Sequence, residues 1–115
     1  MIKIYHNPRC RKSREGLAII EESGKPFEII KYLEDNLTRT ELEEILKILD
    51  INASELVRKQ EAIWKSNFKG KDLTEKMIVN ALLDHPKLIE RPVVIYEGKG
   101  VIGRPPENIS ELLAE

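Results

Sequence analysis

The chain has 115 residues, of which 41% are hydrophobic and 34% charged, a length and composition typical of one ordinary globular domain. Its 19 basic and 20 acidic side chains nearly cancel, so the net charge favours neither nucleic acid nor a membrane as a partner. No apolar run has the length of a signal peptide or a membrane span, and we therefore expect a cytoplasmic protein with a single domain over residues 1–115.

The first third of the chain predicts a strand, a helix and a second strand. Residues 2–6 alternate apolar and polar side chains, as a strand does. A helix is expected over residues 10–23, ended by Gly24 as its C-cap, and residues 27–31 form the next strand. This βαβ order requires two parallel strands joined by a right-handed crossover.

The middle of the chain is predicted to be helical. Thr38 and Glu41 form a capping box at the start of one amphipathic helix. A second helix is expected over residues 54–65, and a third begins near Thr74 and stops before Pro86.

A hairpin and a closing helix complete the chain. Residues 93–96 and 101–103 are short β-rich runs on either side of a glycine-bearing turn over residues 97–100. Pro105-Pro106 opens the last helix, because proline suits the first helical turn. The order of elements predicts a thioredoxin-like α/β fold, with a four-stranded mixed sheet flanked by helices.

Cys10 is the chain's one cysteine, and it lies where the first predicted strand gives way to the first helix. The unpaired N–H groups and partial positive charge of a helix N-terminus stabilise a thiolate and attract an oxyanion. Within three positions on either side, only Pro8 is apolar, which argues against a buried structural cysteine. We expect Cys10 to be a nucleophile with a lowered pKa, assisted by four neighbouring cations: Arg9, Arg11, Lys12 and Arg14.

Two neighbours of Cys10 are candidates for a direct role. Ser13 occupies the place of the second sulfur in Cys-X-X-Cys motifs, so any covalent intermediate on Cys10 needs an external thiol to resolve it. The Ser13 hydroxyl either bonds a free backbone group or donates toward the thiolate. His6 is either a general acid or base or the solvent-facing end of the first strand, and spacing alone favours the solvent-facing end.

Three arginines draw notice: Arg58 follows the apolar pair Leu56-Val57, and Arg91 and Arg104 stand at boundaries between predicted elements. The planar guanidinium fork donates two parallel hydrogen bonds and suits a tetrahedral oxyanion. The alternative for each is an ordinary solvated surface charge. With one cysteine and two histidines, neither an internal disulfide nor a Cys/His zinc site is expected.

The sequence resembles the glutaredoxin-coupled arsenate reductases over nearly its whole length. Six segments carry the resemblance: Tyr5-His6-Asn7-Pro8-Arg9-Cys10 with Ser13-Arg14, Tyr32-Leu33, Leu56-Val57-Arg58-Lys59, His85-Pro86, Glu90-Arg91-Pro92 and Gly103-Arg104-Pro105. The resemblance implies a thioredoxin-like fold with an inserted helical segment and a cis proline at Pro92. It also implies that Cys10 is the nucleophile, that His6 and Ser13 assist the thiolate, and that the oxyanion is bound by Arg58, Arg91 and Arg104.

The reaction that the resemblance implies starts with attack of the Cys10 thiolate on arsenate. Glutathione, as co-substrate, then releases arsenite, and glutaredoxin reduces the Cys10–glutathione disulfide, with no metal or tightly bound cofactor. One departure is that Arg11-Lys12 stands where the best-understood reductases have Gly-Thr. Two alternatives remain: a glutathione-dependent reductase of other disulfides, and a regulator that binds RNA polymerase like the Spx-type proteins, whose Cys-X-X-Cys switch is lost here at Ser13.

Overall fold

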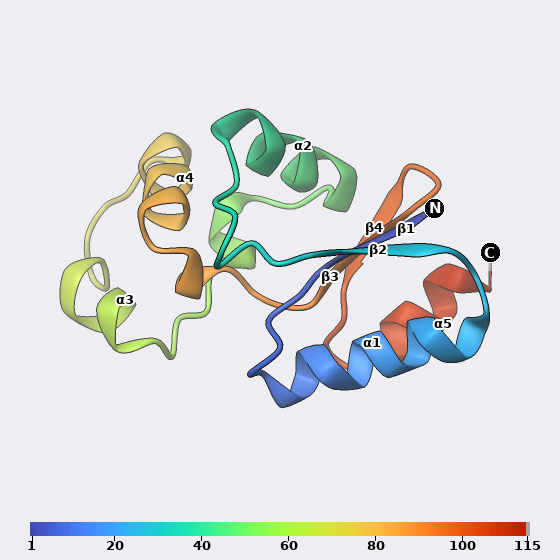
Figure 1. Cartoon of the computed structure of the whole chain (residues 1–115). Helices are drawn as coiled ribbons and strands as arrows, with labels where there is room; N and C mark the ends of the chain where they lie inside the picture. Colours follow the sequence, from blue (N-terminus) through green and yellow to red (C-terminus); the bar gives the residue numbers. More distant parts are fainter. Residues whose placement is uncertain (115) are drawn as a thin grey trace. The chain divides into compact units, whose positions relative to one another are not determined.

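The structure is a computed structural model that describes residues 1–114. The chain forms two compact units (Figure 1): Met1–Asp35 together with the chain from Arg91 onward, and Asn36–Glu90. The second unit is thus a helical insertion in the sequence of the first, as the family resemblance implied. None of the helices within residues 1–114 is long and apolar enough to cross a membrane.

The first unit is built on a four-stranded mixed sheet, as predicted. Its strands are β1 (Ile2–Tyr5), β2 (Phe27–Ile30), β3 (Val93–Tyr96) and β4 (Lys99–Ile102), in the spatial order β2-β1-β3-β4. Strand β1 runs parallel to β2 and antiparallel to β3, so that Ile4 is flanked by Ile29 and Val94. Strands β3 and β4 form an antiparallel hairpin. Every strand has four residues, so the sheet is small and its ends lie close to the connecting loops.

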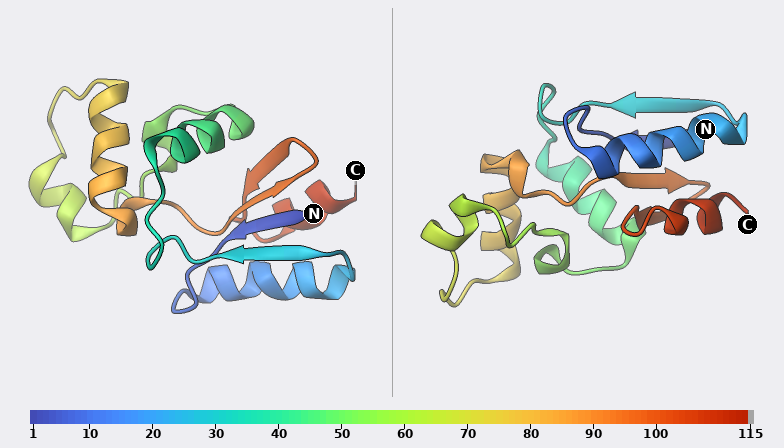
Figure 2. Two further views of the ribbon diagram at one scale, coloured as in Figure 1. Left: turned by 45° about the horizontal axis from the view of Figure 1, so that its top comes forward. Right: turned by 90° about the horizontal axis from the view of Figure 1, so that it is seen from below.

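Two helices, α1 (Arg11–Ser23) and α5 (Glu107–Leu113), lie side by side against one face of this sheet (Figures 1 and 2). Helix α1 ends as predicted at Gly24, whose φ of 73° places it in the left-handed region that favours glycine. The core between helices and sheet is made of aliphatic side chains: Ile2, Ile4, Ile20, Val94, Ile109, Leu112 and Leu113.

Two glycines allow α1 and the end of β4 to approach Pro92 and Ile109 closely. A Cβ at Gly16 would lie 2.8 Å from both Pro92 Cγ and Ile109 Cδ1, and a Cβ at Gly103 would lie 2.8 and 2.7 Å from the same atoms. The Arg91–Pro92 peptide is cis, as predicted, and so is the Arg104–Pro105 peptide. The packing around Pro92 therefore fixes the backbone on which Arg91 and Arg104 stand.

Replacing Gly16 by alanine should destabilise the protein, although the same change in an ordinary helix interior stabilises by about 1 kcal/mol. Pro92 and Ile109 are fully buried, so they cannot move aside, and overpacking of this kind costs about 1–3 kcal/mol. We expect a net loss of about 1–2 kcal/mol in urea unfolding. Adding Ile109→Val removes Cδ1 and should recover part of the loss, and a more stable Gly16→Ala protein would contradict the close approach.

The hairpin turn is shorter than predicted. Glu97 and Gly98 form a two-residue turn with φ of 51° and 78°, so β4 begins at Lys99 and the turn expected over residues 97–100 is wrong. Positive φ at both central residues characterises the turns that match strand twist. The sequence did not reveal this turn because glutamate is an unusual residue in the left-handed region.

The second unit consists of helices. They are α2 (Arg39–Leu49), the 3₁₀ helix η1 (Ala53–Leu56), α3 (Ala62–Asn67), α4 (Glu75–Asp84) and the 3₁₀ helix η2 (Pro86–Leu88). The capping box at Thr38 and Glu41 is present, and Thr74 caps α4 by accepting a hydrogen bond from the Met77 N–H. Both helix starts are therefore where the sequence predicted them.

The predicted helix over residues 54–65 is wrong. Instead, Val57 pairs with Ile89 in an isolated antiparallel β-bridge. On either side of it, the Arg58 N–H donates to Leu88 O at 2.6 Å and the Glu90 N–H donates to Leu56 O at 2.8 Å. These long-range hydrogen bonds take the backbone groups that a continuous helix would need, and tertiary pairing overrides the local pattern.

Candidate active site

The loop between β1 and α1 is closed by hydrogen bonds from its own residues. The Asn7 side chain accepts from the Arg9 N–H at 3.0 Å, and Asn7 O accepts from the Cys10 N–H at 3.0 Å. Arg14 reaches back from α1 and donates to Pro8 O at 3.0 Å. The loop therefore forms a tight turn that delivers Cys10 to the start of the helix.

Cys10 is the N-cap residue of α1, with extended backbone angles, and its thiol is partly exposed. Burial raises the pKa of the Cys10 thiol, but the Ser13 N–H, the Arg91 side chain and the Lys12 N–H together outweigh burial, and the pKa is lowered. The sulfur makes no full capping hydrogen bond, so these amides act on the thiolate from the first turn of the helix. The direction of this shift is the one the sequence predicted.

Alkylation should detect this shift. The rate of Cys10 modification by iodoacetamide, followed against pH, should have its midpoint below about 8.5, the value of an ordinary thiol. The chain has no second cysteine, so the measured rate belongs to Cys10 alone. A midpoint at or above the ordinary value would argue against a nucleophilic role.

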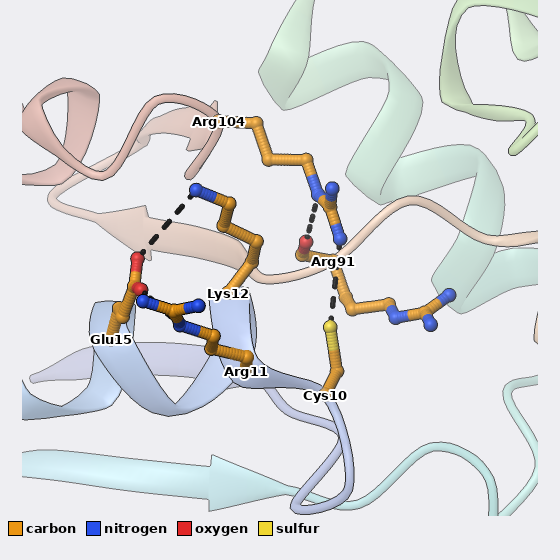
Figure 3. Close-up of polar contacts among 6 residues, drawn as sticks. All are labelled: Cys10, Arg11, Lys12, Glu15, Arg91 and Arg104. Atoms are coloured by element: carbon orange, nitrogen blue, oxygen red, sulfur yellow. Dashed lines mark hydrogen bonds and ion pairs between the residues drawn. The ribbon is translucent and has the colours of Figure 1, made fainter.

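The Arg104 guanidinium contacts the Cys10 sulfur, and Arg91 of the same unit lies beside it (Figure 3). The Arg104 guanidinium donates through Nε to Arg91 O at 2.8 Å and through Nη2 to Cys10 Sγ at 3.5 Å. Arg91 is buried, and its side chain is among the groups that lower the pKa of Cys10. Among residues 1–114, no carboxylate forms an ion pair with Arg104. The positive charge of Arg104 therefore lies beside the sulfur, and no carboxylate within residues 1–114 neutralises it.

The cations at the start of α1 contribute less than the sequence suggested. Arg11 and Lys12 both pair with Glu15 (Figure 3), at 3.2 and 3.8 Å. The Arg11 side chain is 84% exposed. Solvent and the carboxylate screen these charges. Arg91 and Arg104, far from Cys10 in the sequence, supply the positive charge at the sulfur.

His6 and Ser13 form a buried pair beneath the loop. His6 is 4% exposed, so the expectation that it faces solvent at the end of the strand is wrong. Its Nδ1 lies 2.7 Å from Ser13 Oγ, which also accepts from the Asn7 N–H at 3.0 Å. The Ser13 hydroxyl has two lone pairs and one hydrogen, so it accepts from the Asn7 N–H and also shares a hydrogen bond with His6 Nδ1. The Ser13 hydroxyl therefore bonds a free backbone group, the Asn7 N–H, while the Ser13 backbone N–H stabilises the Cys10 thiolate.

The pKa of His6 is lowered, first by burial and then by the charges of Lys31 and Arg14, while Glu21 and Ser13 oppose the shift. The folded protein therefore takes up this proton less readily than the unfolded chain. Stability conferred by neutral His6 is complete above about pH 6.5 and is lost as the pH falls below that value.

We expect wild-type protein to lose stability in urea between pH 7.5 and 5.5 more steeply than a His6→Gln variant. Glutamine keeps a polar side chain that does not titrate, so the difference between the two slopes isolates the imidazole. Parallel slopes would show that His6 does not titrate differently in the folded and unfolded states.

Arg58 lies in the helical unit, and its guanidinium is held by two carboxylates. Nη1 is 2.6 Å from Glu61 Oε1, and Nε is 3.5 Å from Glu90 Oε1. The structure thus brings Arg91 and Arg104 to Cys10, whereas the meeting of Arg58 with them stays a prediction.

Sequence reasoning missed two residues that support the site. Arg14 was counted as a charge near the sulfur, but it holds the loop through Pro8 O. Asn108 donates its amide to Ile102 O and Arg104 O at 3.1 and 3.3 Å, and no motif singles it out. Within residues 1–114, no three His, Cys, Asp or Glu side chains gather as a metal site would need.

The fold and the site together define a thioredoxin-like protein whose first helix presents a low-pKa cysteine beside two arginines. The chain belongs to the ArsC family, whose model matches residues 5–112.

Its relatives are similar over nearly their full length. The uncharacterized protein YfgD of Escherichia coli is 46% identical, covering 97% of this chain and 96% of its own. An arsenate reductase of Neisseria meningitidis is 40% identical over 97% of each chain. The solved structure of an arsenate reductase from Vibrio cholerae matches with a TM-score of 0.90 and 40% identity, over 96% of this chain and 95% of that one.

Proposed function

We propose that the protein is an arsenate reductase that uses Cys10 as its nucleophile and glutathione with glutaredoxin as its reductant. The observation that carries the proposal is the juxtaposition of a thiol of lowered pKa with the Arg104 guanidinium, whose Nη2 lies 3.5 Å from the sulfur. A nucleophile and a donor for oxyanion oxygens are thereby held at one point. Relatives at 40% identity bear the name arsenate reductase.

In the first step the Cys10 thiolate attacks arsenic(V). An As–S bond forms and an As–O bond breaks, and the departing oxygen leaves as water after taking up a proton. In this proposal the oxyanion is neutralised by Arg58, Arg91 and Arg104. Support comes from the contact of Arg104 Nη2 with Cys10 Sγ at 3.5 Å and from the effect of the Arg91 side chain on the pKa of Cys10. The amides at the start of α1 stabilise the thiolate before it reacts.

In the second step a glutathione thiolate attacks the Cys10 sulfur. An S–S bond forms while the As–S bond breaks, and its electron pair stays on arsenic, which leaves as arsenite in the +3 state. A glutaredoxin thiol then attacks the glutathione sulfur and frees the Cys10 thiolate. Both electrons come from thiols, so the proposed reaction needs no tightly bound cofactor. We propose that it takes place in the cytoplasm, together with glutathione and glutaredoxin.

The test is a coupled assay that contains the purified protein, arsenate, glutathione, glutaredoxin and its recycling system. Arsenite should form at a rate proportional to the protein concentration, and omission of glutathione or glutaredoxin should stop it. A Cys10–glutathione adduct without arsenite would instead indicate a glutathione-dependent reductase of other disulfides. Absence of both, together with binding to purified RNA polymerase, would assign the protein to the binding class.

A further inference from the structure

We infer that Asn108 is a positioning residue of the Cys10 site, which holds the backbone at Arg104 so that its guanidinium stays at the sulfur. The inference rests on the proposed function in one respect, which is the choice of arsenate as the oxyanion that binds at the site. Asn108 lies in the first turn of α5, outside the loop that carries Cys10.

The segment between β4 and α5 is short and carries Arg104 near its middle. The Asn108 amide donates to Ile102 O on one side of the segment, at 3.1 Å, and to Arg104 O on the other, at 3.3 Å. Ile102 O also accepts from the Arg104 N–H at 2.8 Å. One side-chain amide therefore bridges the two peptide carbonyls that flank Gly103 and fixes the backbone from which the arginine projects.

The other side of the segment is fixed by packing. The Gly103 N–H donates to Pro92 O at 2.8 Å, and a Cβ at Gly103 would meet Pro92 Cγ and Ile109 Cδ1 at 2.8 and 2.7 Å. Gly103 has no side chain, and the side-chain hydrogen bonds to Ile102 O and Arg104 O come from Asn108.

The restraint reaches the reacting atom through the arginine. Arg104 uses Nε on Arg91 O at 2.8 Å, which leaves Nη2 directed at Cys10 Sγ at 3.5 Å. A long side chain normally loses considerable rotamer entropy when it is ordered. Here a fixed backbone and a fixed Nε hydrogen bond leave the guanidinium already aligned for an oxyanion, which reduces the cost of binding.

The experiment compares wild-type protein with Asn108→Leu, which has a similar volume but no N–H donor, and with Asn108→Gln, which keeps an amide. Two readouts are used: the pH midpoint of Cys10 alkylation, and the arsenate concentration that half-protects Cys10 from iodoacetamide. We expect Asn108→Leu to raise the midpoint and to raise the half-protecting concentration about fivefold, the effect of losing one to two hydrogen bonds. Asn108→Gln should recover part of both effects, and Ser110→Ala, an exposed change in the same helix, should have neither.

A double-mutant cycle distinguishes positioning from general stability. If Asn108 acts through Arg104, then Asn108→Leu should change neither readout further in an Arg104→Ala protein. Equal effects in both backgrounds, or a lowered unfolding midpoint with unchanged alkylation and protection, would overturn the inference. If arsenate protects none of the proteins, the proposed substrate is wrong, and the alkylation midpoints alone decide the role of Asn108.

Discussion

Replacing Cys10 by serine should abolish arsenate reduction and leave a folded protein at least as stable as the wild type. A hydroxyl does not ionise near neutral pH, so the nucleophile is lost. Cys10 is the N-cap of α1 and makes no full capping hydrogen bond, whereas serine is among the preferred N-cap residues. We expect a gain of about 0.5–1 kcal/mol in urea unfolding, measured beside the loss of arsenite formation.

Cys10→Ala is the matched control for this prediction. Alanine removes the nucleophile but cannot cap, so it should be equally inactive without the gain in stability. Residual turnover in either variant above the rate without protein would show that another group performs the first step. A Cys10→Ser protein less stable than the alanine variant would contradict the capping geometry.

Replacing Arg104 by alanine should weaken the use of arsenate by about 1.5–3 kcal/mol, the range for hydrogen bonds to charged groups, or roughly 10- to 150-fold in kcat/KM. Arg104 lies 3.5 Å from the sulfur and has no carboxylate partner within residues 1–114. Its charge is therefore available to the substrate, which is why its loss should be so large.

Arg11→Ala is the appropriate comparison for Arg104→Ala. Arg11 is closer to Cys10 in sequence but pairs with Glu15 on the surface, so its loss should change kcat/KM less than twofold, or about 0.4 kcal/mol. Equal losses in the two variants would mean that the overall positive charge of the region, and not the placed guanidinium, governs the substrate step.

The first strand, the first helix with the cysteine at its start, and the start of α2 could be predicted because their signals are local. Alternation over residues 2–6, the glycine at position 24 and the capping box at Thr38 each belong to one short segment. The predicted helix over residues 54–65 failed because the pairing of Val57 with Ile89 lies outside any local window.

The source of the positive charge at the sulfur was also misjudged. Sequence proximity favoured Arg11 and Lys12, but the partner that screens them, Glu15, lies one helical turn further on. Arg104 could be suspected from the family resemblance, whereas the amide that holds it belongs to a residue in no motif. Burial of His6 likewise depends on how the loop folds over the end of the strand, which no spacing rule describes.

The Ser13 hydroxyl limits how the protein could evolve its own resolving thiol. A single substitution at this position would create a Cys-X-X-Cys pair, but Ser13 is fully buried and its oxygen serves both His6 and the Asn7 N–H. A thiol is a weaker donor and acceptor than a hydroxyl, so the same substitution would loosen the loop that presents Cys10. A cysteine at position 13 could resolve the Cys10 intermediate, whereas a serine there holds the loop that presents Cys10. One side chain cannot do both, and in this sequence it holds the loop.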